Sequence, residues 1–327
     1  MNLQKKFGTF GGVFTPSVLT ILGVIMYMRL GTVIGNSSSI FMFVAIILFA
    51  HVISITTGFS VSSIATDKKI KAGGIYYMLT RSLGFPIGGA IGITLFVATA
   101  LSISLYLIGF AESMLPVIQN IFGIQEVTIN HFRIVGSIAL MVVLFVAYVS
   151  TSFAIKIQYV ILVLIGLSLI SIFTGSSDGL KKGTDLVTNP NFAVLFGIFF
   201  PAVTGFTAGV AMSGDLKNPS KSIPWGTMLA IVTGLVVYLA LAFFLNASID
   251  KDILTTNNNV LIEFGSIAFL VIAGVWGATL SSALGGILGG PRILQAMSLD
   301  NIAPKIFAVG HGVNNEPKCI NSNFYYF

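Results

Sequence analysis

Long apolar runs follow one another along the chain, separated by short polar segments. We predict membrane helices over residues 13–35, 40–65, 86–118, 134–153, 157–174, 192–214, 225–247 and 264–290. Each run is close to the roughly 20 apolar residues that a helix needs to cross a bilayer. An unpaired peptide group is costly in lipid, so spans of this kind must be helical. The runs lack the strict alternation of a membrane β-barrel. The pattern therefore predicts an all-α, polytopic membrane protein with eight spans.

The composition agrees with this class. Of the 327 residues, 55% are hydrophobic and only 9% are charged, whereas an average soluble domain is roughly 25% charged. This excludes a soluble cytosolic enzyme and a disordered chain. The single cysteine, Cys319, excludes an internal disulfide scaffold, and His51, His131 and His311 are scattered along the sequence. We therefore expect neither an enzyme nor a bound cofactor.

Positive charge predicts the orientation. An even number of spans puts both chain ends on one side, and cytoplasmic segments are rich in Lys and Arg. With the N-terminus inside, the inner basic residues are Lys5, Lys6, Lys68, Lys69, Lys71, Arg81, Lys156, Lys217, Lys221, Arg292, Lys305 and Lys318. The outer ones are Arg29, Arg133, Lys181, Lys182 and Lys251. This distribution predicts a multi-pass protein of the cell membrane with a cytoplasmic N-terminus. No aromatic–basic interleaving suggests nucleic acid as a partner.

Two of the predicted helices carry backbone-breaking residues near their midpoints. The first contains Thr20 and Gly23, and the sixth contains Pro201, Thr204 and Gly205. Proline removes a backbone donor and frees a carbonyl one turn earlier, and glycine lets the chain turn. Matched interruptions five helices apart are typical of inverted-repeat transporters, whose site lies at the bilayer midplane. The alternative is that proline and glycine are simply common in membrane helices.

Two charged residues fall in the outer halves of predicted spans, Arg29 in the first and Glu112 in the third. A charge at the centre of a span costs roughly 2.5–3.5 kcal/mol on insertion scales. Two interpretations stay open. The residues are independent interfacial charges, or they pair across an outer vestibule and form a gate.

Polar residues in the apolar helices allow two interpretations as well. Ser281 and Ser282 in the eighth helix suit close helix packing, and their hydroxyls equally suit a dehydrated sodium ion. Tyr106 in the third helix is either a buried hydrogen-bonding aromatic residue or a cation ligand.

Several blocks of the sequence resemble the cation–chloride cotransporters, within the amino acid–polyamine–organocation superfamily of amino acid permease-type proteins. The blocks are residues 13–16, 25–31, 106–112, 199–205, 213–216, 278–284, 291–292 and 300–304, and the resemblance covers about residues 7–310. It implies a five-plus-five inverted-repeat fold and secondary active symport of chloride with sodium, potassium or both. Alternating access would then rock helices 1, 2, 6 and 7 against the rest, and the family habit suggests a homodimer in the lipid bilayer.

The resemblance also implies the roles of individual residues. A sodium site would use carbonyls of Leu19, Leu22 and Ala278 with hydroxyls of Ser281 and Ser282. A potassium site would use backbone at Thr20, Ile21 and Pro201 with hydroxyls of Tyr106 and Thr204, although asparagine is usual where Thr20 stands. Chloride would bind at amides of Gly23, Val24 and Ile25, and at Gly205, Phe206 and Thr207. The outer gate would be Arg29 with Glu112.

Two other functions remain open. Amino acid carriers of the superfamily usually place a Gly-Ser/Ala-Gly run at the first break, where this chain has the bulkier residues 22–25. An amino acid permease is therefore the second hypothesis. The third is an inactive membrane subunit, because the family continues with helices 9 to 12 whereas residues 311–327 contain no further span. We expect a permease domain over residues 1–310 and an atypical tail, as in a truncated, frameshifted or split gene product.

Overall fold

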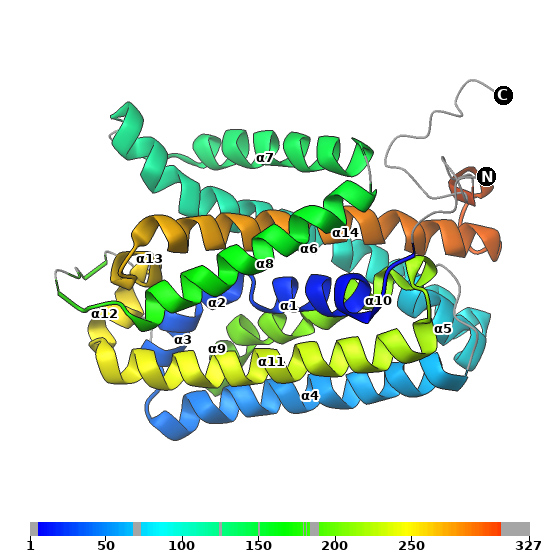
Figure 1. The fold of residues 1–327 in the computed structure, drawn as a ribbon, viewed down its shortest axis with the longest axis horizontal. Helices are drawn as coiled ribbons and strands as arrows, with labels where there is room; N and C mark the ends of the chain where they lie inside the picture. The colour runs from blue at the N-terminus through cyan, green and yellow to red at the C-terminus, as the bar shows by residue number, and fades with distance from the viewer. Residues whose placement is uncertain are drawn as a thin grey trace.

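The computed structural model describes residues 6–67, 73–123, 126–149, 151–178, 180, 182–183 and 190–308, which are almost entirely helical (Figure 1). Eight segments of this part are long and apolar enough to cross a membrane. They are Phe10–Met28, Ile40–Asp67, Phe85–Phe122, Ile129–Tyr148, Ile155–Phe173, Phe192–Ala211, Pro219–Ser248 and Ala268–Leu299. The predicted all-α fold with eight spans is confirmed. The predicted tail and Lys5, Lys68, Lys69, Lys71, Lys181 and Lys318 lie outside the described residues.

The first span is built from short pieces. A π-helical turn, η1 (Phe10–Phe14), leads into α1 (Thr15–Ile21), and α2 (Val24–Met28) and α3 (Leu30–Gly35) follow. The helix is interrupted at Leu22 (φ −82°, ψ 42°) and Gly23 (φ −92°, ψ −154°), neither of which is helical. The predicted break in the first span is therefore present, at Gly23.

The sixth span is broken as well. It begins as α9 (Phe192–Phe199), whose first turn is capped by the Asn191 side chain, which accepts a hydrogen bond from Val194 N at 3.0 Å. The chain then tightens into the 3₁₀ segment η2 (Phe200–Phe206) before α10 (Thr207–Ala211) and the short turn η3 (Ser213–Asp215). The break predicted from Pro201 and Gly205 falls within η2.

The remaining helices are largely continuous rods. They are α4 (Ile40–Asp67), α5 (Gly74–Leu83), α6 (Phe85–Phe122), α7 (Ile129–Val149), α8 (Thr151–Phe173), α11 (Pro219–Ser248), α12 (Lys251–Thr256), α13 (Val260–Phe264) and α14 (Ala268–Leu299), with η4 (Lys305–Ala308) at the end of the described chain. Helices α4 and α11 run side by side, and α14 packs between α6 and α8 (Figure 1).

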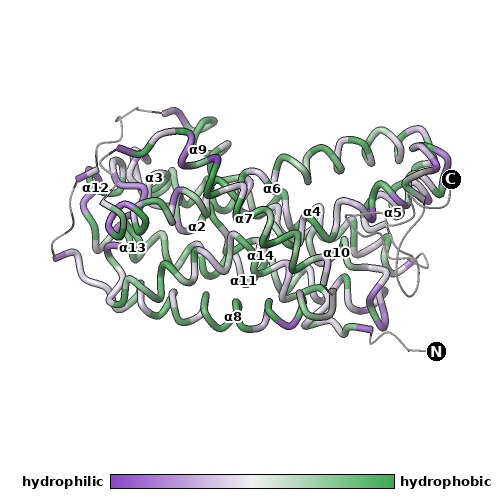
Figure 2. Tube along the Cα trace, turned by 90° about the horizontal axis from the view of Figure 1, so that it is seen from above, coloured by the Kyte–Doolittle hydropathy of each residue, from purple (hydrophilic) through white to green (hydrophobic). Residues whose placement is uncertain are grey.

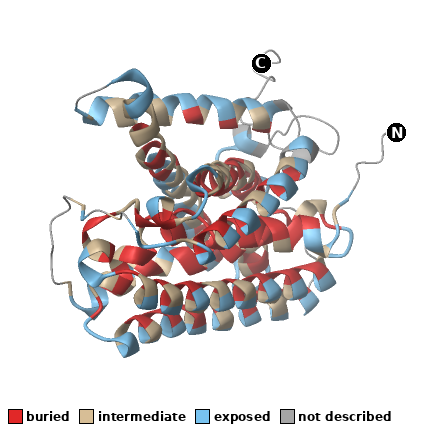
Figure 3. Cartoon of the chain, turned by 60° about the vertical axis from the view of Figure 1, so that its left-hand side comes forward, coloured by how far each residue is buried: buried red, intermediate tan, exposed pale blue. Residues whose placement is uncertain are grey.

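The broken spans lie in the middle of this bundle. Buried residues concentrate along α1, α2 and the elements that surround them, while α7 shows mostly exposed and intermediate residues (Figure 3). Hydrophilic residues gather at the two ends of the molecule and apolar residues line the helices between them (Figure 2). This is the distribution that a bilayer requires, since lipid solvates the apolar middle and water the polar ends.

Several predicted boundaries are wrong, among them the starts of the fourth and seventh spans, where α7 begins at Ile129 and α11 at Pro219. We expected spans over 134–153 and 157–174, but α7 ends at Val149 and α8 begins at Thr151. The polar residues within 150–158 show that two spans meet in this region, but they do not show at which residue one helix ends and the next begins. We also expected the last span to cover 264–290, but α14 begins at Ala268 and continues through Pro291 to Leu299. A proline is tolerated inside a membrane helix where neighbouring groups satisfy the backbone that it frees.

Candidate functional site

The two helix breaks touch each other at the centre of the bundle. A β-carbon built on Gly205 would lie 2.7 Å from both Ile21 N and Thr20 C. A side chain at position 205 would therefore collide with the backbone of α1. Glycine is required here because the two interrupted helices approach at backbone distance.

Four successive carbonyls at the first break have lost their helical partners. Leu22 N still donates to Val18 O at 2.8 Å, and across the break Met26 N donates to Gly23 O at 3.1 Å. Within the described chain, no backbone N–H donates to the carbonyls between them, those of residues 19–22. These are the four carbonyls that the sequence resemblance assigned to cations, namely Leu19 and Leu22 to sodium and Thr20 and Ile21 to potassium.

A small cavity of about 40 Å³ lies beside the breaks. Its lining contains all five residues assigned to potassium, Thr20, Ile21, Tyr106, Pro201 and Thr204, with Val24, Ile25, Ser102, Leu105 and Ala202. One water-sized probe sphere occupies about 10–15 Å³, so this space suits a single ion with little water. The structure therefore brings together residues from the first, third and sixth spans around one compartment.

The hydroxyl groups of this cavity keep acceptor capacity. Thr20 Oγ1 donates to Pro16 O at 2.9 Å, and Thr204 Oγ1 donates to Pro201 O at 2.8 Å. Each hydrogen is used within its own span, which leaves the oxygen lone pairs free to face a cation.

The two serines of α14 are buried without hydrogen-bond partners. Ser281 and Ser282 are each 2% exposed, and no group in the described chain bonds either Oγ atom. Ser282 Oγ would lie 3.6 Å from a β-carbon on Gly23, so it reaches the first break. Buried hydroxyls almost always have a partner. These two unpartnered oxygens therefore fit a ligand such as a cation, and Ala278 lies fully buried one turn away on the same helix.

A larger cavity of about 360 Å³ continues from the small one. The two share Thr20, Ser102, Tyr106 and Thr204. The larger cavity extends along α6, α10 and α14 to Gly73 and Gly74 at the start of α5. In Figure 1, α5 and α10 lie toward the end of the molecule that carries the N-terminus.

The residues assigned to chloride are divided among these spaces. Val24 and Ile25 line the small cavity, whereas Gly205 and Thr207 line the larger one. Gly23 faces Ser282 and Thr20. Phe206 lines neither cavity, because it is 3% exposed and its carbonyl accepts a hydrogen bond from Ser17 Oγ at 3.0 Å. Of the second set of chloride residues, Gly205 and Thr207 therefore line one cavity together, and Phe206 does not line it.

Arg29 and Glu112 form a two-pronged ion pair. Nη1 lies 3.0 Å from Oε1 and Nη2 lies 2.8 Å from Oε2, and the side chains are 33% and 21% exposed. Of the two interpretations left open by the sequence, the structure shows the pair and excludes independent charges. It joins the α2–α3 junction to α6, on the side of the first break that faces away from α5 and α10 (Figure 1).

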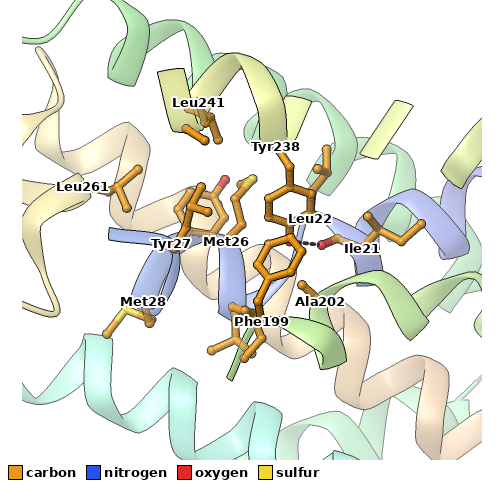
Figure 4. Close-up of a cluster of buried hydrophobic side chains, with 14 of the residues drawn as sticks. Ile21, Leu22, Met26, Tyr27, Met28, Phe199, Ala202, Tyr238, Leu241 and Leu261 are labelled. Carbon is orange, nitrogen blue, oxygen red and sulfur yellow. Dashed lines mark hydrogen bonds between the residues drawn. The ribbon is translucent and has the colours of Figure 1, made fainter. Parts of the chain in front are cut away.

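Sequence reasoning missed a set of buried hydroxyls that bond carbonyls at the breaks. Tyr238 Oη donates to Ile21 O at 2.7 Å (Figure 4), and Ser54 Oγ donates to Val203 O at 2.9 Å. Isolated hydroxyl residues in apolar helices give no signal of a partner in another helix. The salt bridge between Arg292 and Asp215 was missed for the same reason.

Comparison with known proteins shows which family this chain matches. Residues 12–318 match the family model described as amino acid permease. The chain is 33% identical to solute carrier family 12 member 2 of Mus musculus, over 95% of this chain and 30% of the relative. It is 32% identical to solute carrier family 12 member 1 of Homo sapiens, over 95% of this chain and 34% of the relative. The chain thus spans about a third of the length of these curated relatives.

Proposed function

Because this chain belongs to the amino acid permease family of membrane transporters and resembles the cation–chloride cotransporters within it, we propose that it transports chloride together with sodium, potassium or both. The observation that carries the proposal is the small cavity at the two breaks, whose lining includes all five residues assigned to potassium. The activity is proposed for the whole protein, since this chain covers only 30% and 34% of these two relatives.

The chemistry of the cavity favours a monovalent cation. Its polar lining consists of backbone carbonyls and the hydroxyls of Thr20, Ser102, Tyr106 and Thr204, and it contains no carboxylate. Divalent ions in proteins are usually held by one or more carboxylates. In the described chain no cluster of three His, Cys, Asp or Glu residues could hold a metal ion. Neutral oxygen ligands are what replaces the hydration shell of an alkali ion in membrane proteins.

Sodium has its own supporting observation. The hydroxyls of Ser281 and Ser282 are buried without partners, and that of Ser282 reaches the first break, where the Leu19 and Leu22 carbonyls are also free of backbone partners. A sodium ion ligated by these oxygens and the Ala278 carbonyl would satisfy all of them at once. Potassium would occupy the neighbouring small cavity, whose lining includes Thr20 and Ile21 of the same four-carbonyl segment.

Coupling to chloride follows from the short distances involved. Two opposite unit charges about 4 Å apart gain roughly 4 kcal/mol at an effective dielectric constant of about 20. A chloride near Val24 and Ile25, or near Gly205 and Thr207, would share its cavity with the proposed cation residues. Each ion then lowers the cost of burying the other, which makes the movement of both together favourable.

Alternating access would open the site to one side at a time. The Arg29–Glu112 pair closes the side toward α3, while the larger cavity leads from the site toward α5. We assign the pair the role of outer gate. The cytoplasmic N-terminus, the location in the cell membrane and the homodimer belong to the same proposal.

A second candidate function has one specific observation in its favour. The larger cavity, at about 360 Å³, falls within the range of roughly 300–1,000 Å³ typical of sites for small organic ligands. An amino acid permease would use this space and place the substrate carboxylate at the first break. An inactive membrane subunit is the third candidate.

Uptake by liposomes that contain the purified full chain separates these functions. We expect rubidium uptake that saturates and is lost when chloride is replaced by gluconate. Uptake of a labelled amino acid with no chloride requirement would instead establish the permease. Absence of all uptake, in vesicles shown to contain folded protein, would support the inactive subunit.

A further inference from the structure

The carbonyl of Ile21 differs from the three others freed at the first break. It accepts a hydrogen bond at 2.7 Å from the hydroxyl of Tyr238, which comes from α11 and is fully buried. No side chain in the described structure donates to the carbonyls of Leu19, Thr20 or Leu22. Among the four freed carbonyls of the described structure, that of Ile21 is thus the one held by a side-chain hydrogen bond from a neighbouring helix.

The tyrosine ring has little freedom to move. It packs edge-on against Phe199 of α9, with ring centroids 5.1 Å apart at 83° (Figure 4). It also lies 6.1 Å from the His51 ring of α4. His51 is itself fixed, because its Nδ1 lies 2.8 Å from Ile47 O. The hydroxyl therefore meets the break at a position that is set by α11 itself and by two other helices, α4 and α9.

The residue whose carbonyl is bonded is part of the cavity lining. Ile21 lines the 40 Å³ compartment together with Thr20 and Val24 from the same span. A carbonyl oxygen has two lone pairs, so the bond to Tyr238 uses one and leaves the other for an ion. Because the peptide unit is planar, holding its oxygen fixes the orientation of the whole Ile21–Leu22 peptide.

We propose that Tyr238 is a positioning residue for the transported cation: its hydroxyl holds the Ile21 carbonyl in the orientation that binds potassium at the first break. This inference rests on the proposed function, since it concerns the cation cavity of that transporter. Tyr238 itself touches no ion and acts through one backbone oxygen. The residue lies outside the blocks that carry the family resemblance, on a helix to which no ion-binding residue was assigned.

The test is the Tyr238→Phe variant in the full chain, because it keeps the ring and removes only the hydroxyl. We expect the KM for rubidium to rise about fivefold, the factor that one ordinary buried hydrogen bond is worth. The KM values for sodium and chloride should change less than twofold. An independent readout is the rise in melting temperature that potassium chloride produces over choline chloride, which should shrink in the variant.

Tyr76→Phe is the matched control. Tyr76 belongs to α5, at the far end of the larger cavity, and is also fully buried. Its hydroxyl donates a hydrogen bond to Asp300 at 2.9 Å. Its ring does not line either cavity, so the variant should keep the wild-type KM for every ion. If the two tyrosine variants behave alike, or if Tyr238→Phe lowers only the amount of folded protein, Tyr238 is merely structural and the inference is wrong. A lower KM for rubidium would also overturn it, since the bond would then withdraw the carbonyl from the ion.

The wild-type protein tests the premise separately. If it neither takes up rubidium nor gains stability from potassium, the cation cavity and the positioning role both fall. If it does either and Tyr238→Phe does so equally well, the proposed function stands and only the positioning role is excluded.

Discussion

The guanidinium of Arg292 lies 2.7 Å from the carboxylate of Asp215, and the two side chains are only 6% and 15% exposed. The pair joins α14 to η3, next to Ala211, Gly289 and Ile293 in the lining of the larger cavity. The backbone of Asp215 is held as well, because Phe7 N donates to Asp215 O and Lys217 N donates to Phe7 O, both at 2.8 Å. One residue thus connects the start of the first span, the end of the sixth and the last helix.

Removing one partner of this pair should destabilise the protein strongly. Arg292→Gln or Asp215→Asn leaves an uncompensated buried charge, and breaking buried pairs in this way costs about 3–5 kcal/mol. We expect a clear fall in the melting temperature of the detergent-purified protein. The double variant should recover part of the loss.

The Lys182–Asp252 pair supplies the control. Its N–O distance is also 2.7 Å, but the side chains are 66% and 73% exposed, and exposed pairs contribute little. Lys182→Ala should leave the melting temperature unchanged. If Lys182→Ala lowers the melting temperature as much as Arg292→Gln or Asp215→Asn does, burial of the Arg292–Asp215 pair does not increase its contribution to stability.

Neutralising Glu112 should loosen the outer side of the site. Glu112→Gln removes the charge that binds both nitrogens of Arg29. In a Cys319→Ser background, a cysteine introduced by Ile25→Cys reports access, because Ile25 lines the small cavity and is 9% exposed. We expect an impermeant thiol reagent added from outside to label it faster in the Glu112→Gln protein. Labelling at an unchanged rate would mean that the ion pair is structural and does not gate the cavity.

Removing the hydroxyls of Ser281 and Ser282 should weaken sodium binding without lowering the stability of the protein. Their hydroxyls have no partner in the described structure, so Ser281→Ala and Ser282→Ala remove buried polar groups that are unsatisfied without an ion. Stability measured without sodium should stay the same or rise. The KM for sodium should increase at least tenfold.

Thr279→Val is the matched change on the same helix. Thr279 Oγ1 donates to Val275 O at 2.8 Å, so it is buried and already satisfied. This variant should leave the KM for sodium unchanged. If the serine variants lose stability in the absence of sodium, their hydroxyls serve packing, which is the alternative that the sequence left open.

The sequence predicted the parts of the fold that depend on local composition. Spans follow from apolar length, and the breaks at Gly23 and Pro201 follow from residues that disfavour a continuous helix. The predicted α7–α8 boundary was wrong because the polar segment 150–158 shows where two spans meet but not the residue at which either helix ends. The predicted end of α14 was wrong because the charge of Arg292 is paired with Asp215 on a distant segment, and no local pattern reveals that pairing.

The candidate site divides in the same way. That carbonyls would be freed at the first break could be predicted, because loss of helical pairing at a break is a local event, whereas their assignment to particular cations comes from the family resemblance. Arg29 with Glu112 could be suspected from the cost of charge in a membrane. The contact between Tyr238 and Ile21 required the packing of α11 on α1. Contacts of this kind join single residues far apart in sequence, and neither periodicity nor motif spacing specifies them.

The close approach of the two breaks makes a last prediction. In Gly205→Ala, the new methyl group would lie 2.7 Å from Ile21 N and from Thr20 C, and backbone atoms cannot move aside as a flexible side chain would. The breaks must separate, which displaces Thr20 and Thr204, one from each break, in the lining of the small cavity. We expect ion-dependent uptake and potassium-dependent stabilisation to be lost together.

Gly197→Ala tests the same substitution in α9 of the same span, where a β-carbon meets no atom within 4 Å. That variant should transport normally and be slightly more stable, because alanine is favoured over glycine in a helix by about 1 kcal/mol. Normal uptake by Gly205→Ala would show that contact between the breaks does not form the site.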